Sequence, residues 1–166
     1  MTVFTNIFQS YLAPMSVFKK RIIYVSDSEL FGILIIGCLI TLIGRFPDMY
    51  AQALFYGDPL VGLFSATLVA ILLILPLGLY FFSGLFFLVF RVLRIEVSNF
   101  QLRLSLFWSF TLVSPFGLLL AMMELVNVLT VIEVASASLI FIIFLVYFCL
   151  FLRVCFVQNM LEDKKP

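Results

Sequence analysis

The sequence has no histidine among its 166 residues. Histidine is the commonest general base at neutral pH and the commonest protein ligand for metals and haem, so the usual routes to these chemistries are missing. No phosphate-binding loop, dinucleotide-binding glycine pattern or zinc-ligand spacing occurs either. We therefore expect a protein that is not an enzyme and that binds no cofactor and no metal.

Charge is also scarce. Charged residues make up 11% of the chain, whereas soluble domains carry about 25%. The net charge of +1 gives no reason to expect a nucleic acid partner. The carboxylates of Glu29, Glu96, Glu124 and Glu133 fall at the ends of the long apolar runs and not in their middles. A carboxylate at mid-membrane would indicate proton or ion coupling, so its absence argues against a coupled transporter.

The three cysteines are Cys38, Cys149 and Cys155, and no CxxC pair occurs. All three lie in apolar stretches, which favours the interpretation that they are small buried apolar side chains. Metal binding and lipidation are the alternatives. Cys155, near one predicted membrane face, is the candidate for acylation.

Apolar residues, by contrast, make up 64% of the chain. A soluble protein of this length could not keep so much apolar surface from water, so the surrounding medium must be lipid. We predict an all-α, polytopic helical membrane bundle, formed as a single membrane domain with four transmembrane helices. The predicted spans are residues 29–45, 60–90, 104–123 and 134–157.

Residues 1–28 are predicted to form an interfacial N-terminal segment. Apolar side chains recur there at helical spacing, as at Phe4, Tyr11 and Phe18, and the segment leads into a basic run at 19–21. A disordered apolar tail is the alternative. Because the first basic residues come so late, we expect no signal peptide.

Two further segments complete the expected layout. Residues 45–59, between the first two spans, mix polar and apolar side chains and are predicted to carry a second interfacial helix. Residues 158–166 are predicted to form a charged cytoplasmic tail. The start of the first span is marked by Ser26 and Glu29, which have capping-box spacing.

The run 60–90 carries no charge and, as a straight helix of about 46 Å, exceeds the ~30 Å hydrocarbon core. It is either one long span kinked at Pro76 or two half-spans.

With four spans, nine of the ten basic residues fall on one side of the membrane, and two full spans over residues 60–90 would weaken that bias. The positive-inside rule then places both termini in the cytoplasm. The nine are Lys19, Lys20, Arg21, Arg91, Arg94, Arg103, Arg153, Lys164 and Lys165.

Small residues at spacing four predict helix contact faces, because close approach rather than hydrophobicity drives helices together in lipid. The basic connector between the second and third spans is the other candidate contact. It is either a docking face for a partner or for anionic lipid headgroups, or ordinary topology-setting charge. The packing candidates are Gly62, Ala66, Ala70, Ser105, Ser109, Gly117 and Ala121, and the connector candidates are Arg91, Arg94 and Arg103.

This layout resembles the small bacterial members of the Yip (Rab/Ypt-interacting protein) membrane family. The features that carry the resemblance are an interfacial N-terminal segment, a long second span, a basic turn, the aromatic-Ser run 107–109 and Pro115 within the third span. The resemblance implies location in a bacterial inner membrane but no settled activity. Five spans are usual in that family, whereas four are counted here, and no GTPase-binding role is implied.

Two functions are compatible with these features. The first is a non-catalytic scaffold or accessory subunit that contacts the lipid bilayer and other membrane protein subunits. The second is a small oligomeric transporter or channel-like protein, which needs a polar path. The hydroxyl residues able to line such a path are Ser65, Thr67, Ser105, Ser109, Thr111 and Ser114.

Overall fold

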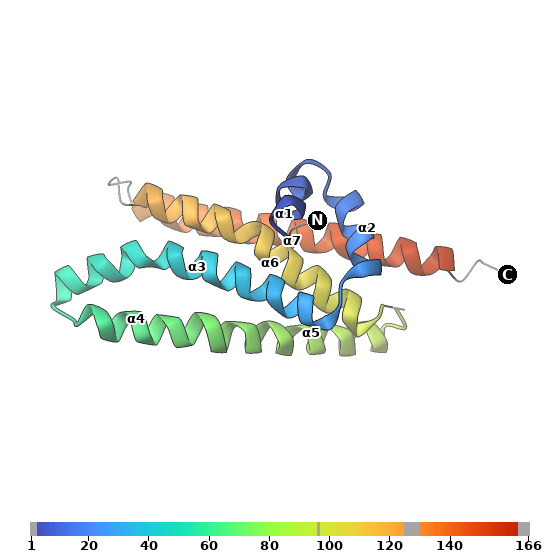
Figure 1. Cartoon of the computed structure of the whole chain (residues 1–166), viewed down its shortest axis with the longest axis horizontal. Coiled ribbons are helices and arrows are strands. Elements are labelled where there is room, and N and C mark those ends of the chain that lie inside the picture. Colours follow the sequence, from blue (N-terminus) through green and yellow to red (C-terminus); the bar gives the residue numbers. More distant parts are fainter. Residues whose placement is uncertain (1–2, 96, 125–129, 163–166) are drawn as a thin grey trace.

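The protein was analysed as a computed structural model, which describes residues 3–95, 97–124 and 130–162, without the side chains of 3–6, 8, 123–124, 130–136 and 160–162. All regular structure in these ranges is helical (Figure 1). The helices are α1 (Val3–Leu12), α2 (Pro14–Tyr24), α3 (Asp27–Tyr56), α4 (Leu60–Val69), η1 (Ala70–Ile74), α5 (Leu75–Val92), α6 (Asn99–Glu124) and α7 (Thr130–Glu162).

Four of these helical stretches are long and apolar enough to cross a membrane, which confirms the predicted helical membrane bundle with shorter N-terminal helices. The helices that contain these stretches extend beyond the spans predicted from the apolar runs, since α3 continues to Tyr56 and α7 to Glu162. The observed candidate spans are Asp27–Tyr56, Leu60–Val92, Asn99–Met122 and Ala137–Asn159.

The segment predicted as a separate interfacial helix is helical, but it continues α3 without a break. Arg45 and Asp48 form an ion pair three residues apart on the helix surface, which favours the helical backbone through Pro47. The helix ends only at Gly57, whose φ of 71° and N–H bond to the carbonyl of Ala53 form a left-handed cap.

Residues 60–92 form one long helix and not two half-spans (Figure 1). One wide turn, η1, lies in its middle, where the N–H of Leu75 bonds to the carbonyl of Ala70, five residues back. Pro76 follows at once and has no N–H to donate, so the widened turn absorbs the disruption that a proline causes inside a helix.

Helices α3 and α6 form the centre of the bundle, and glycine allows their close approach. A Cβ on Gly37 would lie 2.9 Å from both Phe110 Cε1 and Thr111 Oγ1 on α6. A Cβ on Gly44 would lie 3.3 Å from the backbone of Leu118. Thr111 Oγ1 also donates to the carbonyl of Ile33 on α3 at 2.9 Å. Close backbone approach and an interhelical hydrogen bond are the two ways in which helices associate in lipid.

The N-terminal helices form a hairpin that packs on the outside of the bundle (Figure 1). Tyr11 on α1 donates a 2.6 Å hydrogen bond to the carbonyl of Leu112 and packs edge-on against Phe116. Phe18 on α2 stacks on Phe151 of α7, with ring centroids 4.3 Å apart. The segment predicted to lie at the interface is therefore bound to the side of α6 and α7.

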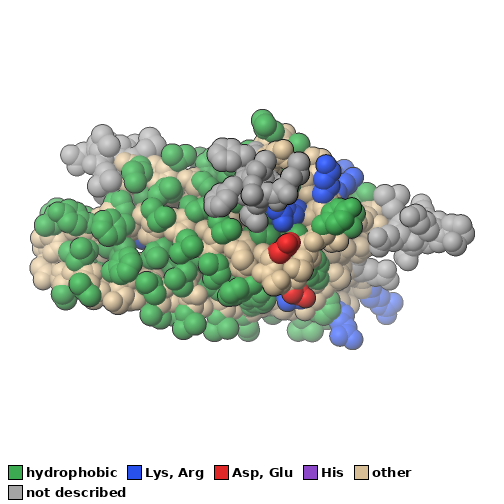
Figure 2. Space-filling model, viewed as in Figure 1, with side chains coloured by type: hydrophobic (Ala, Val, Ile, Leu, Met, Phe, Trp, Pro, Cys, Tyr) green, Lys and Arg blue, Asp and Glu red, His purple; other side chains and the backbone are tan. Residues whose placement is uncertain are grey.

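Lys and Arg side chains gather at one end of the molecule, where α5 ends, α6 begins and α2 packs (Figures 1 and 2). We call this the basic end and the opposite end of the bundle the far end. Arg45 lies about 27 Å along α3 from Asp27, which marks the basic end, at about 1.5 Å per residue. This separation matches the ~30 Å thickness of a hydrocarbon core.

Candidate functional site

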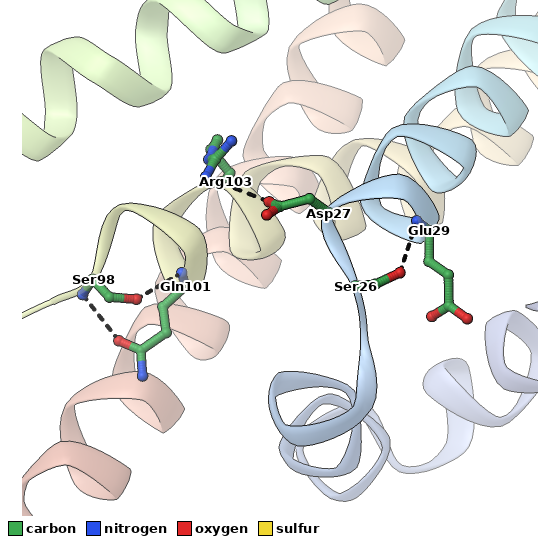
Figure 3. Close-up of polar contacts among 6 residues, drawn as sticks. All are labelled: Ser26, Asp27, Glu29, Ser98, Gln101 and Arg103. Atoms are coloured by element: carbon green, nitrogen blue, oxygen red, sulfur yellow. Dashed lines mark hydrogen bonds and ion pairs between the residues drawn. The ribbon is translucent and has the colours of Figure 1, made fainter.

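The turn between α5 and α6 is a basic feature at the surface of the described chain. Arg91 and Arg94 are both exposed, and neither forms an ion pair with a described residue. Arg103 differs, because its guanidinium lies 3.6 Å from the carboxylate of Asp27 at the start of α3 (Figure 3). Of the three predicted contact residues, Arg91 and Arg94 are thus available to a partner, whereas Arg103 joins two helices.

Arg94 holds an unusual backbone conformation. Its φ is 56°, and it is the only described residue other than glycine with a positive φ. The N–H of Arg94 bonds to the carbonyl of Arg91, and the N–H of Ile95 bonds to that of Phe90. This pair of bonds is the Schellman motif that ends many helices, and glycine usually occupies the left-handed position. An arginine there is strained by about 1–2 kcal/mol.

The start of α6 is fixed by a reciprocal capping box that the sequence analysis missed (Figure 3). The N–H of Gln101 donates to Ser98 Oγ, and Gln101 Oε1 accepts from the N–H of Ser98, both at 3.1 Å. Gln101 also exchanges amide hydrogen bonds with Asn159 of α7, at 2.9 and 3.2 Å. The Ser-x-x-Gln spacing was visible in the sequence and could have located this helix start.

The predicted helix start at Ser26 is confirmed, since Ser26 Oγ accepts from the N–H of Glu29 at 3.4 Å. The Glu29 carboxylate points away from Ser26, so only half of the capping box forms (Figure 3). The Glu29 side chain instead lines an open groove of about 620 Å³ with residues of α1 and α2, among them Gln9, Lys20 and Tyr24.

Helix α2 is tied to the core at the same end through Arg21. Its guanidinium carbon lies 5.1 Å from the centroid of the Trp108 ring, a cation–π contact with the only tryptophan. Burial lowers the pKa of Arg21, and the nearby Glu29 opposes this shift. Trp108 itself is fully buried. Its position in the core, with Phe107 and Ser109, gives the aromatic-Ser run a packing role.

The predicted small-residue faces have three different outcomes. Ser105 and Ser109 are fully buried, and Ser105 Oγ lies 3.6 Å from Cys155 Sγ on α7, so these two residues do pack helix on helix. The stripe on α4 and at the first residue of η1 is exposed. The exposed stripe consists of Gly62, Ala66 and Ala70, and the remaining two, Gly117 and Ala121, line a cavity at the far end.

Neither that cavity nor the role of the glycines that bring α3 against α6 was predicted from the sequence. Gly37 and Gly44 are seven residues apart and share one face of the first span. Small residues at spacing four do not include this pair. The cavity lies between α3, α5, α6 and α7, with Arg45 and Asp48 among its lining residues. No local sequence signal marks a space shared by four helices.

Among the hydroxyl residues considered for a polar path, Thr111 bonds to α3, and four serines donate to carbonyls of their own helix. Ser65, Ser105 and Ser109 each donate to the carbonyl four residues earlier. Ser114 donates to the carbonyl of Thr111, which Pro115 leaves without its usual N–H partner. This use of the hydroxyls adds no support to the transport hypothesis.

The three cysteines differ in burial. Cys38 and Cys155 are buried as predicted, whereas Cys149 is exposed. Within the described ranges, no three His, Cys, Asp or Glu side chains come close enough together to hold a metal ion.

The fold and the basic end together define a four-span helical membrane bundle with an N-terminal helical hairpin. Comparison with protein-family models, with curated proteins and with solved structures found no match in any of the three.

Proposed function

We propose that this chain is a non-catalytic accessory or scaffold subunit of a membrane protein complex. The observation that carries the proposal is the exposure of the helix Leu60–Val92. Only 11% of its most apolar stretch is buried within the chain, against 61% for the span in α6. This span therefore has few fully buried residues, and many of its large apolar side chains are exposed.

The length of this helix is a second reason to expect that another protein, as well as lipid, contacts it. The uncharged part of this helix measures about 46 Å, so it projects beyond a hydrocarbon core of about 30 Å. At the far end, where α3 turns into α4, Leu54, Phe55, Tyr56 and Val61 are strongly exposed. Apolar side chains outside the hydrocarbon core are stabilised when another protein surface covers them.

The exposed stripe of Gly62, Ala66 and Ala70 supplies a surface on which a second helix can pack closely. At the basic end of the same helix, Arg91 and Arg94 extend the contact to the aqueous side. The strain at Arg94 supports a role for its side chain, because glycine would form the same turn without that cost.

Cysteine cross-linking tests this proposal. The variant to be tested carries Ala66→Cys, and its exposed Cys149 is replaced by alanine. This variant is treated in native membranes with a bifunctional maleimide. We expect one adduct of constant mass that contains a second polypeptide. Ile142→Cys on α7 is the matched control, since Ile142 is also exposed on an apolar span. Equal yields from both positions, or dimers of this chain alone, would count against a partner on α4.

We further propose a bacterial inner membrane location with both termini in the cytoplasm, and membership of the Yip family. The gathering of the described Lys and Arg side chains at the basic end supports the orientation through the positive-inside rule. The layout of an N-terminal hairpin, a long second span and a basic turn supports the family proposal. Reporter fusions to each terminus test the orientation: activity of a periplasm-dependent reporter at either end contradicts it.

A further inference from the structure

The far end contains a cavity of about 510 Å³, within the ~300–1,000 Å³ typical of sites for small molecules. All four spans contribute to its lining, and most of that lining is apolar. Leu79 comes from α5, Phe110 and Gly117 from α6, and Ile140 and Phe144 from α7. Its shape and chemistry therefore suit a flexible apolar group.

Small residues keep this space open. A Cβ placed on Gly117 would meet no atom within 4 Å, and Ala121 and Ala137 also face the cavity. By contrast, a Cβ on Gly37 would lie 2.9 Å from side-chain atoms of α6, and Gly44, which lines the cavity, approaches the backbone of Leu118 at its edge. The cavity is thus a separate space in the bundle and not the result of uniformly loose packing.

Two charged residues, Arg45 and Asp48, border the cavity, and every other lining residue is uncharged. Arg45 Nη1 lies 3.1 Å from Asp48 Oδ2, and the two side chains are 64% and 31% exposed. Their distance along α3 from the basic end places them at the opposite headgroup level, while Phe110 and Phe144 lie deeper in the hydrocarbon region. The cavity thus joins a charged rim to an apolar interior, as a phospholipid joins its headgroup to its acyl chains.

The charges select among lipids. A guanidinium binds a phosphate through two parallel hydrogen bonds, so Arg45 suits the phosphate of any glycerophospholipid. Asp48 beside it repels a headgroup with net negative charge but accepts hydrogen bonds from an ammonium group. A primary ammonium can donate such bonds, whereas the quaternary ammonium of a choline headgroup cannot.

We propose that this cavity binds a phospholipid with an ethanolamine headgroup from the leaflet at the far end. The phosphate lies on Arg45, the ammonium lies on Asp48, and one acyl chain lies among Leu79, Phe110 and Phe144. This site is independent of the partner surface on α4 and of the turn at Arg91 and Arg94.

The test is native mass spectrometry of the full chain in a mild detergent, titrated with three lipids of identical acyl chains. We expect phosphatidylethanolamine to bind more tightly than phosphatidylcholine and phosphatidylglycerol. Loss of charged hydrogen bonds in Arg45→Gln should weaken phosphatidylethanolamine binding by about 10–100-fold. Asp48→Asn should reverse the preference toward phosphatidylglycerol, whereas Asp58→Asn, which does not line the cavity, should leave it unchanged.

A second variant tests the cavity itself. Gly117→Leu places a side chain in open space, so the fold is retained while the acyl-chain site is filled. Phosphatidylethanolamine binding should fall by about tenfold or more. Gly84→Leu, at an exposed position of α5 with equally open space, is the matched control. Circular dichroism and thermal unfolding verify that each variant is folded.

Three results would overturn the proposal. One is equal binding of the three lipids, and another is preference of the unmodified chain for the anionic lipid. The third is unchanged binding in a folded Gly117→Leu variant, which would mean that only lipids around the outside of the bundle are detected. Displacement of the lipid by a co-purifying polypeptide would also assign the cavity to a different occupant.

Discussion

The two ends of the bundle are built from different side chains. At the basic end, Phe18, Phe107, Trp108 and Phe151 are fully buried and join four helices. At the far end, α4 buries no residue, and small residues of α6 leave a cavity. Helix α6 shows the change along its length, since residues 104–109 are all buried whereas none of residues 115–120 is.

The difference separates the part that stabilises the fold from the part that is open to other molecules. Large aromatic side chains fill the space at the basic end and hold the N-terminal hairpin against the spans. Glycine and alanine at the far end leave room that the chain does not fill by itself. Substitutions should therefore affect stability mainly at the basic end and binding mainly at the far end and at the exposed turn.

The largest expected effect on stability is that of Phe107→Ala. Removing a fully buried ring that packs edge-on against Tyr80 should lower the free energy of unfolding by about 3–5 kcal/mol. Phe82→Ala is the matched control, because the Phe82 ring is 52% exposed and its loss should change little. Denaturant titration in micelles measures both, and equal losses would show that the aromatic core does not hold the fold.

The contact of α3 with α6 is the next most sensitive feature. Gly37→Ala inserts a methyl group at 2.9 Å from Thr111 Oγ1 and should cost about 1–3 kcal/mol. Gly32→Ala on the same helix meets nothing within 4 Å and should stabilise the chain by up to about 1 kcal/mol through helix propensity. Thermal unfolding of the pair measures the difference, and a stable Gly37→Ala variant would contradict the close approach.

Arg94→Gly should move stability and binding in opposite directions. Relief of the left-handed strain should stabilise the turn by about 1 kcal/mol, while loss of the side chain weakens the proposed partner contact. Arg91→Gln serves as the control, since it removes a neighbouring charge without changing the backbone. If Arg94→Gly raises the unfolding temperature and leaves the partner bound as before, the side chain has no contact role.

The smallest expected effect concerns the ion pair at the basic end. Asp27 is 75% exposed, and its Oδ1 lies 3.6 Å from Nη2 of Arg103, so solvent screens the interaction. Asp27→Asn should therefore cost less than about 1 kcal/mol, and less still at high salt. Unfolding of this variant at two salt concentrations is the measurement, and a loss of several kcal/mol would mark this pair as a structural centre of the basic end.

Much of the fold could be predicted because long uncharged runs identify membrane spans directly. The helix limits could not, since α3 continues through Arg45 and Pro47, where a local ion pair and the cap at Gly57 decide where it ends. Trp108 lies in the core beneath Arg21. That position depends on how the N-terminal hairpin docks, which no local pattern encodes.

The candidate site also has parts that could be predicted from the sequence and parts that could not. Arg91 and Arg94 could be selected from sequence, because a basic connector stands out between two apolar runs. The strain at Arg94 and the pairing of Arg103 with Asp27 depend on the turn and on the neighbouring helix. The cavity at the far end requires four helices to be placed together, so only the structure reveals it.

The most direct test of the proposed role is native mass spectrometry of the chain extracted from its own membranes in a mild detergent. The account predicts a second polypeptide in fixed ratio, lost from the Arg91→Glu, Arg94→Glu double variant while the chain remains folded. Recovery of only the single chain or of its homo-oligomer from the unmodified protein would contradict it.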